Sequence, residues 1–282
     1  MKDQILFYID EMTGPLRIPV PANEARQLIV RIDQRDKMSP SAPAERQLSI
    51  ILEPGSSLEL FILSGLPASV QNRVQTSILL KEQSSLKLTE LILDEGEGTY
   101  HTEAVLEGAE AVLDYAGAYG SRNSTNRLHT LQTHHFGKQS KSRTTLKSAL
   151  KDSSHLVFKG LIHVDNRAAG TDAYLSNRNM VLNDGCRAES LPQLQIETDD
   201  VACSHGSTTG GPREEELFYI MSRGLSPEEA KELLVMGHLS SILNRFPPSL
   251  AEEAEEAVSA LLLTNNAAST AATTKTVQGA VR

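Results

Sequence analysis

Between Leu48 and Val201 the chain is built from brief runs in which apolar and polar residues alternate, and no long stretch of helical period interrupts them. Successive side chains of a strand point to opposite faces, so these runs predict strands. Gly, Ser, Asn and Asp separate the runs at an irregular spacing. Many short strands can build a sandwich, a barrel or a solenoid, and periodicity alone does not choose among them. A β-helix would account for the lack of intervening helices, because each turn of chain stacks on the last around a shared core.

The C-terminal part of the chain predicts three short amphipathic helices. Proline lies near the start of the first, three glutamates follow in the early turns, where the helix dipole favours them, and Gly224 ends it. The second begins with a capping box at 226–229 and stops before Pro247. The third begins in the same way at Ser249. Residues 264–282 are small, polar and nearly aperiodic, which predicts a disordered tail.

Charge and composition exclude several classes of protein. The formal net charge of −9 argues against a general nucleic-acid binder, whose phosphate contacts demand a basic surface, and favours a protein partner. The N-terminal residues MKDQILFYIDEM carry charges inside their only apolar run, so they predict neither a signal peptide nor a membrane span. With two cysteines and no export signal, a disulfide framework is not expected. We therefore expect a cytoplasmic protein.

Residues 191–224 are the most informative stretch for function. They place a short strand, a thiol and an imidazole two residues apart, a glycine-rich turn and an amphipathic helix in immediate succession. The alternation puts Leu191 on the same apolar side of the strand as Leu194. If the extended geometry continues, Cys203 and His205 point to one face, where a thiolate and a neutral imidazole could converge on a soft or borderline metal. Two ligands do not make a site, and a cysteine here is equally suited to filling an apolar core.

This stretch resembles the C-terminal signature of the SufB/SufD family, the scaffold proteins of the Suf iron–sulfur cluster assembly machinery. The matching blocks, in order, are residues 192–197, 199–201, 203–206, 217–219, 222–224 and 226–230. From about residue 40 to 190 the resemblance lies mostly in the texture of strands and turns. The resemblance implies a right-handed parallel β-helix with a small C-terminal helical domain, and so decides the fold that periodicity leaves open. The expected organisation is an N-terminal segment (1–40), a β-helix core (41–211), a C-terminal helical domain (212–263) and the disordered tail (264–282).

Two interpretations of the helical end remain open. Its apolar residues could seal the open end of the solenoid. The resemblance implies instead that the helices dock the ABC-type ATPase SufC, and the candidate contact residues are Glu215, Phe218, Tyr219 and Arg223. The chain has no GxxxxGK[ST] loop, so ATP hydrolysis is expected in the partner and the chain is not itself an enzyme.

Departures from the family pattern favour a short SufD-like member. SufB members carry a cysteine shortly after an Arg-Asn pair, whereas here the pair at 178–179 is followed by no thiol until Cys186. His205 falls on the position at which a SufD-type histidine is implicated in building the cluster. The chain also has only about forty residues in place of the N-terminal helical domain of longer members. We expect it to pair with a SufB-like paralogue or with a second copy of itself.

The candidate metal ligands are too few for a cluster bound by one chain. Iron–sulfur clusters usually need about four thiolates, with histidine as an occasional substitute. Cys186, Cys203 and His205 do not reach that number. We therefore expect a transient iron–sulfur cluster, or iron alone, shared at a subunit interface. Cys186 lies about one rung before Cys203 and could approach it by stacking, or be an isolated turn cysteine.

Two rival functions come from other classes. Parallel β-helices also serve as polysaccharide lyases and hydrolases, and the dense carboxylate group Glu90, Asp94, Glu95 and Glu97 is where such a site would be sought. The other rival is a purely structural solenoid that binds proteins without metal chemistry. The remaining histidines, among them His134, His135, His155 and His163, are expected to be surface residues or to be satisfied by local hydrogen bonds.

Overall fold

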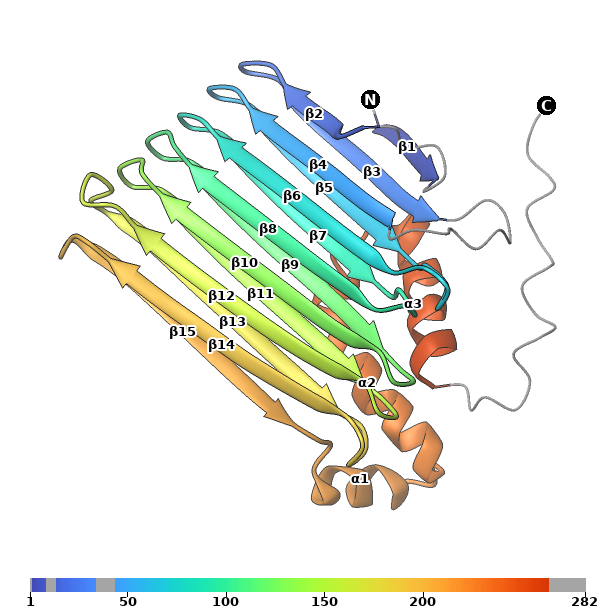
Figure 1. The fold of residues 1–282 in the computed structure, drawn as a ribbon. Coiled ribbons are helices and arrows are strands. Elements are labelled where there is room, and N and C mark those ends of the chain that lie inside the picture. Colours follow the sequence, from blue (N-terminus) through green and yellow to red (C-terminus); the bar gives the residue numbers. More distant parts are fainter. Residues whose placement is uncertain (1, 9–13, 34–43, 264–282) are drawn as a thin grey trace, which may run out of the picture.

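The computed structural model describes residues 2–8, 14–33 and 44–263, and in this part of the chain strands are followed by helices (Figure 1). The tail predicted to be disordered, residues 264–282, lies outside the described residues. The strands are β1 (Lys2–Tyr8), β2 (Leu16–Val20), β3 (Ala25–Asp33), β4 (Ala44–Leu52), β5 (Ser57–Ser64), β6 (Asn72–Leu80), β7 (Ser85–Ile92), β8 (Gly98–Leu106), β9 (Val112–Ser121), β10 (Asn126–His135), β11 (Lys141–Leu150), β12 (His155–Val164), β13 (Thr171–Val181), β14 (Arg187–Ile196) and β15 (Val201–Gly210). The helices are α1 (Glu214–Met221), α2 (Pro227–Leu243) and α3 (Pro248–Leu262).

Consecutive strands alternate between two parallel sheets. The odd-numbered strands form one sheet, in the order β1-β3-β5-β7-β9-β11-β13-β15, and the even-numbered strands form the other, from β14 to β2. Each strand pairs with the strand two places earlier in the chain, so that Ser85 lies beside Ser57 and Val112 beside Ser85. The chain therefore winds as a two-sheet solenoid with rungs of about 30 residues. The predicted parallel β-helix with C-terminal helices is confirmed.

Stacked turns impose local demands on the sequence. At one end of the rungs, a Cβ atom on Gly137 would lie 1.8 Å from the carbonyl oxygen of Gly108 in the turn beneath it. Only glycine allows one backbone to approach another so closely. The turns also repeat a residue with positive φ, such as Asn123 at 60° and Gln139 at 56°. The turns differ in length, which explains why the Gly, Ser, Asn and Asp residues that separate the strands recur at no fixed spacing.

The strands begin before the predicted start of the β-helix core at residue 41. β2 pairs with β4 and β3 pairs with β5, so both belong to the two sheets of the solenoid. Ile18 and Val20 are buried in the common core. The sequence pattern did not reveal β2 because this strand has five residues and contains Pro19.

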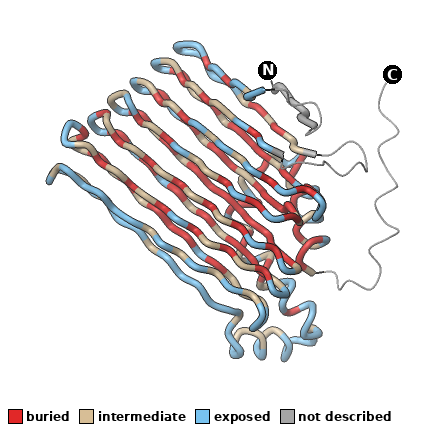
Figure 2. The backbone as a smooth tube through the Cα atoms, in the orientation of Figure 1, coloured by how far each residue is buried: buried red, intermediate tan, exposed pale blue. Residues whose placement is uncertain are grey.

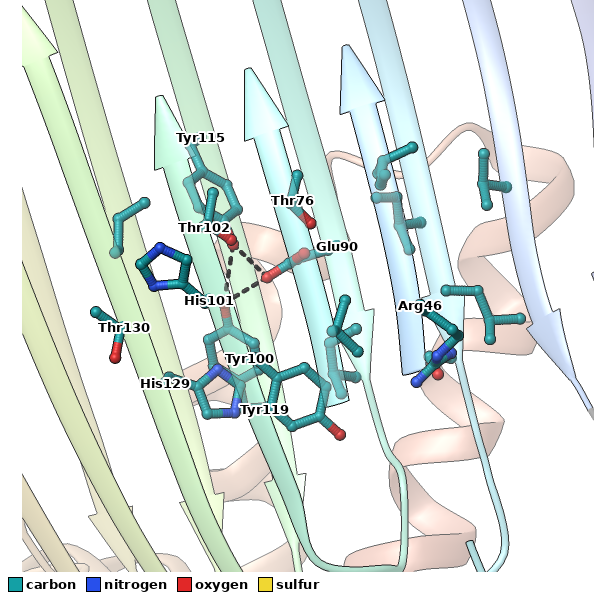
Figure 3. Close-up of a pocket in the computed structure, with 18 of the residues that line it drawn as sticks. Arg46, Thr76, Glu90, Tyr100, His101, Thr102, Tyr115, Tyr119, His129 and Thr130 are labelled. Atoms are coloured by element: carbon teal, nitrogen blue, oxygen red, sulfur yellow. Dashed lines mark hydrogen bonds between the residues drawn. The ribbon is translucent and has the colours of Figure 1, made fainter. Parts of the chain in front are cut away.

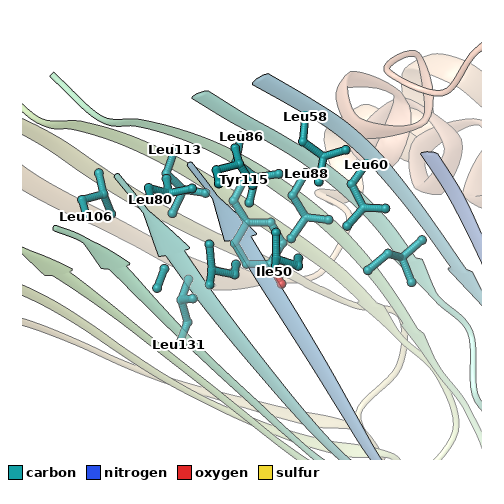
Figure 4. Packing of buried hydrophobic residues seen from close by; sticks show 14 of the residues in the cluster. Ile50, Leu58, Leu60, Leu80, Leu86, Leu88, Leu106, Leu113, Tyr115 and Leu131 are labelled. Atoms are coloured by element: carbon teal, nitrogen blue, oxygen red, sulfur yellow. The ribbon is translucent and has the colours of Figure 1, made fainter. Parts of the chain in front are cut away.

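The interior core consists of side chains that point between the two sheets. In-register pairing places like residues above one another, so Leu58 of β5 lies beside Leu86 of β7, and Leu86 beside Leu113 of β9. Leu60 and Leu88 form the neighbouring pair (Figure 4). Burying each such side chain contributes about 1.5–3 kcal/mol.

Helices α2 and α3 pack on the outer face of the odd-numbered sheet. A second apolar cluster joins outward side chains such as Phe61 to helix residues such as Val235 and Val258. The ring of Phe61 lies 5.7 Å from that of Phe246, measured between centroids. Arg245 also donates two hydrogen bonds of 2.9 Å to the carboxylate of Asp114 on β9. The helices therefore flank the solenoid, and the interpretation in which they seal its open end is wrong.

The helix starts agree only partly with the sequence. The capping box of α2 is confirmed, because Ser226 Oγ accepts from the Glu229 N–H and the Glu229 carboxylate accepts from the Ser226 N–H. α3 begins at Pro248 with Pro247 as its N-cap, so the predicted cap at Ser249 is wrong. Proline suits the first helical position because the N–H that it lacks would have no partner there.

Burial is uneven along the solenoid. Figure 2 shows buried positions throughout the middle rungs, whereas β14, β15 and α1 are mostly exposed. Among the described residues, no helix is long and apolar enough to cross a membrane.

Candidate functional site

The candidate site lies at the last rung of the solenoid, made by β14 and β15. Each of these strands ends the strand order of its sheet, so within the described residues β14 pairs only with β12 and β15 pairs only with β13. The other edge of each strand presents free backbone N–H and C=O groups, which are a template for another chain. In the part of the chain that the structure describes, no further rung stacks on this one, and Figure 2 shows both strands mostly exposed.

Cys203 and His205 point to the same face of β15, as predicted. Their register partners on β13 are Ala173 and Leu175, which are both buried in the interior core. Since paired residues of a parallel sheet share a face, both candidate ligands point inward. His205 is exposed only because the solenoid ends there, whereas Cys203 is half-buried and packs against the core.

The two candidate ligands differ in their readiness to bind a metal. They are two residues apart on an extended strand, which is roughly 6.6 Å along the chain. Burial raises the pKa of the Cys203 thiol above its usual value. The thiol is therefore protonated at neutral pH and must lose its proton when it binds a metal. His205 is the more accessible ligand, and its side chain faces the space that a further rung would fill.

Cys186 does not join these two residues. It lies in the turn between β13 and β14, where its Sγ lies 3.0 Å from the Asn183 carbonyl oxygen and 3.3 Å from that of Leu150. Cys203 follows the opposite turn, between β14 and β15. β14, which has ten residues and is roughly 33 Å long, lies between these two turns, so the two thiols are toward opposite ends of the rung. Stacking of rungs therefore does not bring Cys186 near Cys203.

Aliphatic side chains accompany the candidate ligands at the end of the solenoid. Leu194 and Ile196 pair with the buried Ile162 and Val164, so they point inward, yet they are 37% and 40% exposed. Leu191 pairs with Lys159 and points outward, where it is 50% exposed. The prediction that Leu191 shares a face with Leu194 is wrong, because they are three positions apart and side chains of a strand return to the same face every two.

Helix α1 is a second exposed surface beside the last rung. No residue of α1 is buried. Phe218 is 74% exposed and Tyr219 is 60% exposed. The guanidinium of Arg223 lies 5.1 Å from the centre of the Tyr219 ring, and its Nη2 donates a 2.9 Å hydrogen bond to the Tyr219 hydroxyl. The candidate Glu215 is exposed on the same helix. The structure therefore leaves all four candidate docking residues free of the core.

An interior cavity with a mostly apolar lining and a few polar groups was not predicted from the sequence. It has a volume of about 60 Å³ and lies between the two sheets (Figure 3). The hydroxyls of Tyr115 and Tyr119 both donate to the Glu90 carboxylate, whose pKa burial raises. The ring of His129 lies against those of Tyr100 and Tyr119, and burial, with Arg127 as a smaller cause, lowers its pKa to about 3. The imidazole of His129 is therefore neutral.

The carboxylates that an enzyme of the lyase class would need do not form a surface cleft. Glu90 points into the cavity, and Asp94 is fully buried and accepts hydrogen bonds from Ser64, Asn72 and Tyr100. Glu95 pairs with Arg122 at 2.8 Å, and Glu97 accepts a long hydrogen bond from Asn126. These contacts hold the turns of the solenoid together.

The structure confirms the prediction for His135 and also shows a contact between His134 and His163 that was not predicted. His135 is fully buried, with ring nitrogens 2.8 and 2.9 Å from the hydroxyls of Ser140 and Ser142, so it is satisfied locally as expected. His134 and His163 lie on neighbouring strands and are brought together by the register of β10 and β12. That proximity could not be read from the sequence, because it depends on which strands pair and in which register.

The chain matches the family model of the SufBD core domain, described as SUF system iron–sulfur cluster assembly, over residues 16–238. This match covers the solenoid from β2 onward, including the exposed last rung, together with α1 and most of α2. The chain belongs to the SufBD family. The resemblance seen in its C-terminal motif is confirmed.

Curated SufBD proteins resemble the chain over about half of its length. It is 31% identical to the iron–sulfur cluster assembly protein SufD of Bacillus subtilis over 153 residues, which are 54% of this chain and 32% of that protein. It is 30% identical to SufD of Escherichia coli over 159 residues, or 52% of this chain and 38% of that protein. A SufBD family protein of Mycobacterium leprae is 36% identical over 147 residues, or 49% and 37%. The matched segment is thus between 32% and 38% of the length of these relatives.

Proposed function

We propose that this protein is a SufD-like scaffold subunit for iron–sulfur cluster assembly. Family membership supports the general role, and the similarity to two SufD proteins supports the subtype. The observation that carries the proposal is the inward-facing pair Cys203 and His205 on an edge strand that ends the solenoid. At that position this chain supplies some of the metal ligands, and a partner whose strands extend the two sheets would supply the others.

The proposed partner at this edge is a SufB-like paralogue or a second copy of the chain. Its strands would extend both sheets by pairing with the free backbone groups of β14 and β15. Leu194 and Ile196 would then be covered, and removing their apolar surface from water would stabilise the pair at about 25 cal/mol/Å². A transient iron–sulfur cluster, or iron alone, is the cargo of this shared site. His205 supplies a ring nitrogen, and the partner supplies the thiolates that this chain lacks.

The proposed partner at α1 is a SufC-type ABC ATPase. An exposed aromatic pair with Arg223 beside it has the composition typical of interface anchors. α1 is followed by α2, and Arg245, just after the end of α2, fixes this part of the chain to Asp114 on β9. Movement of a bound ATPase would therefore be transmitted to the solenoid through a rigid attachment. In this proposal ATP hydrolysis belongs to the partner, this chain is not an enzyme, and its cytoplasmic location remains a prediction.

The site is tested by reconstituting clusters on the assembled complex. His205→Ala should lower the visible absorbance per bound iron after anaerobic addition of iron and sulfide, because a ligand or proton relay is lost. Ser207→Ala is the matched control, since Ser207 lies two residues further on the same inward face of β15 and is also exposed. Cys203→Ala should have a smaller effect if Cys203 is only part of the core, and Cys186→Ala should have almost none. Wild-type cluster yield and rate in His205→Ala would refute the assignment.

The docking surface is tested on α1 alone, because removing α2 and α3 would uncover their apolar cluster on the solenoid. The double variant Phe218→Ala and Tyr219→Ala should weaken ATPase binding at least tenfold, which is about 1.4 kcal/mol. Leu233→Ala is the control, since Leu233 is an exposed apolar residue of α2. Unchanged ATPase affinity in the α1 variant would contradict the docking proposal and would leave the cluster site untouched.

A further inference from the structure

Two histidines face each other on the outer surface of the even-numbered sheet. His134 of β10 and His163 of β12 are direct register partners, at the carboxyl ends of their strands. Their Nδ1 atoms are 3.2 Å apart. Both side chains are largely shielded from solvent, at 19% and 15% exposure.

Each ring presents its other nitrogen to a carboxylate. The Nε2 atom of His163 lies 3.1 Å from Oε1 of Glu197, at the end of β14. The Nε2 atom of His134 lies 3.7 Å from Oε1 of Glu103 on β8. Four neighbouring strands thus contribute a row in the order Glu, His, His, Glu across the sheet.

This row restricts the tautomers of the two rings. A carboxylate favours a proton on the nitrogen that faces it, so both Nε2 atoms are expected to carry the proton. The two Nδ1 lone pairs then point at each other, which is repulsive unless a cation lies between them. If His134 instead donates from Nδ1, its bare Nε2 faces the Glu103 carboxylate, and that atom is shielded from solvent without a hydrogen-bond partner. Neither arrangement of the two neutral rings is free of conflict, and a metal ion bound between the two Nδ1 atoms would remove it.

We propose that His134 and His163 bind a divalent transition-metal ion through their Nδ1 atoms. With metal–nitrogen bonds of about 2.05 Å, a separation of 3.2 Å gives a nitrogen–metal–nitrogen angle of about 103°, which is close to tetrahedral. Glu103 and Glu197 then act as the carboxylates that orient metal-binding histidines through their second nitrogen. Imidazole ligands suit Zn²⁺, Ni²⁺ and Cu²⁺. Of these three ions, Cu²⁺ should bind most tightly, and Ni²⁺ and Zn²⁺ should both bind more weakly.

The surroundings fit a small open site. Among the described residues, no group of three or more His, Cys, Asp or Glu side chains is placed to hold a metal, so water or an exogenous ligand completes the coordination. The ring of Phe136 lies 5.9 Å from that of His163 and covers one side. Arg167 stacks on Phe136, but its charge is paired with Asp165 at 2.7 Å and does not oppose a cation. The site is on the opposite sheet from His205, so it is separate from the proposed cluster site.

The test measures metal binding by the full chain, stripped of metal and of any purification tag. Cys186, Cys203 and His205 are first replaced (Cys186→Ser, Cys203→Ser, His205→Asn), so that the proposed cluster site cannot contribute. Titration calorimetry with Zn²⁺ and Ni²⁺ should give one ion per chain. His134→Asn and His163→Asn should each weaken binding more than about 100-fold, and Glu197→Gln, which removes only the orienting carboxylate, about 10- to 100-fold.

His155 provides a matched control. Its Nε2 lies 3.2 Å from Glu189 on β14, as that of His163 lies beside Glu197, but its register partner on β10 is Asn126. His155→Asn should leave the affinity unchanged. Circular dichroism of each variant must match the parent protein, and Glu197→Gln, at an exposed position, keeps the test valid if a histidine variant fails to fold. Absence of one-to-one binding by the parent protein, or equal affinity in His155→Asn and His163→Asn, would overturn the proposal.

Discussion

Replacing Phe61 tests how the helices are attached to the solenoid. The ring of Phe61 points out of β5 into the cluster with α2 and α3, and the residue is 1% exposed. Burying about 150 Å² of aromatic surface at about 25 cal/mol/Å² corresponds to about 4 kcal/mol. Because the neighbours of a truncated ring relax only partly, Phe61→Ala should lower the free energy of unfolding by about 3–5 kcal/mol.

Phe218→Ala is the matched control for this measurement. It removes the same ring from α1, where Phe218 is 74% exposed, and should change the free energy of unfolding by no more than about 0.5 kcal/mol. Urea unfolding followed by circular dichroism gives both values, provided that the dependence on urea concentration keeps the same slope. A cost below about 1 kcal/mol for Phe61→Ala, or equal costs for the two variants, would refute the attachment of α2 and α3 to this face.

Further predictions concern the cavity, a helix cap and a stacked turn. Burial raises the pKa of Glu90 above its usual value near 4.5, so the folded state holds this proton more tightly than the unfolded state and stability falls as pH rises through the folded pKa. Glu90→Gln cannot ionise, so its stability relative to wild type should improve from pH 4 to pH 8 in urea titrations; a difference independent of pH would contradict this. Ser226→Ala should cost about 1 kcal/mol in the same assay through loss of the α2 cap. Ser259→Ala keeps the backbone carbonyl that accepts the C-cap N–H of α3 and loses only a 3.3 Å hydrogen bond to the exposed Glu232, so it should cost less than half of that. Gly137→Ala should lower the melting temperature, because its Cβ would overlap the Gly108 carbonyl, whereas Gly14→Ala meets no atom within 4 Å.

The sequence predicted the strand-rich body and the helix starts that carry strong local signals. Alternation and turn residues mark most strands, and the capping box at Ser226 depends on residues three apart. β2 was missed because it is short and contains Pro19. The attachment of α2 and α3 could not be predicted, since strands such as β5 and β9 are buried on both faces, and their composition does not say what covers the outer one.

Only those features of the candidate site that depend on a single strand could be predicted from the sequence. Cys203 and His205 share a face because both lie on one strand, and this needs no tertiary information. Their position at the end of the solenoid needs the strand order. Glu90 was grouped with Asp94, Glu95 and Glu97 as the place to seek a lyase site, yet β7 turns its side chain into the interior cavity. The contact between His134 and His163 depends on register alone, which no local pattern encodes.

Hydrogen exchange on the assembled complex tests the central claim, that the last rung is an interface around His205. In the free protein, the amides of β15 that face away from β13 have no partner strand and should exchange rapidly. On assembly with the SufB-like paralogue, or on self-association, exchange of amides in the segment 203–207 should slow by about tenfold or more. Amides of β9, which is paired on both sides, should not change. Complete complex formation with unchanged exchange across β14 and β15 would contradict the account.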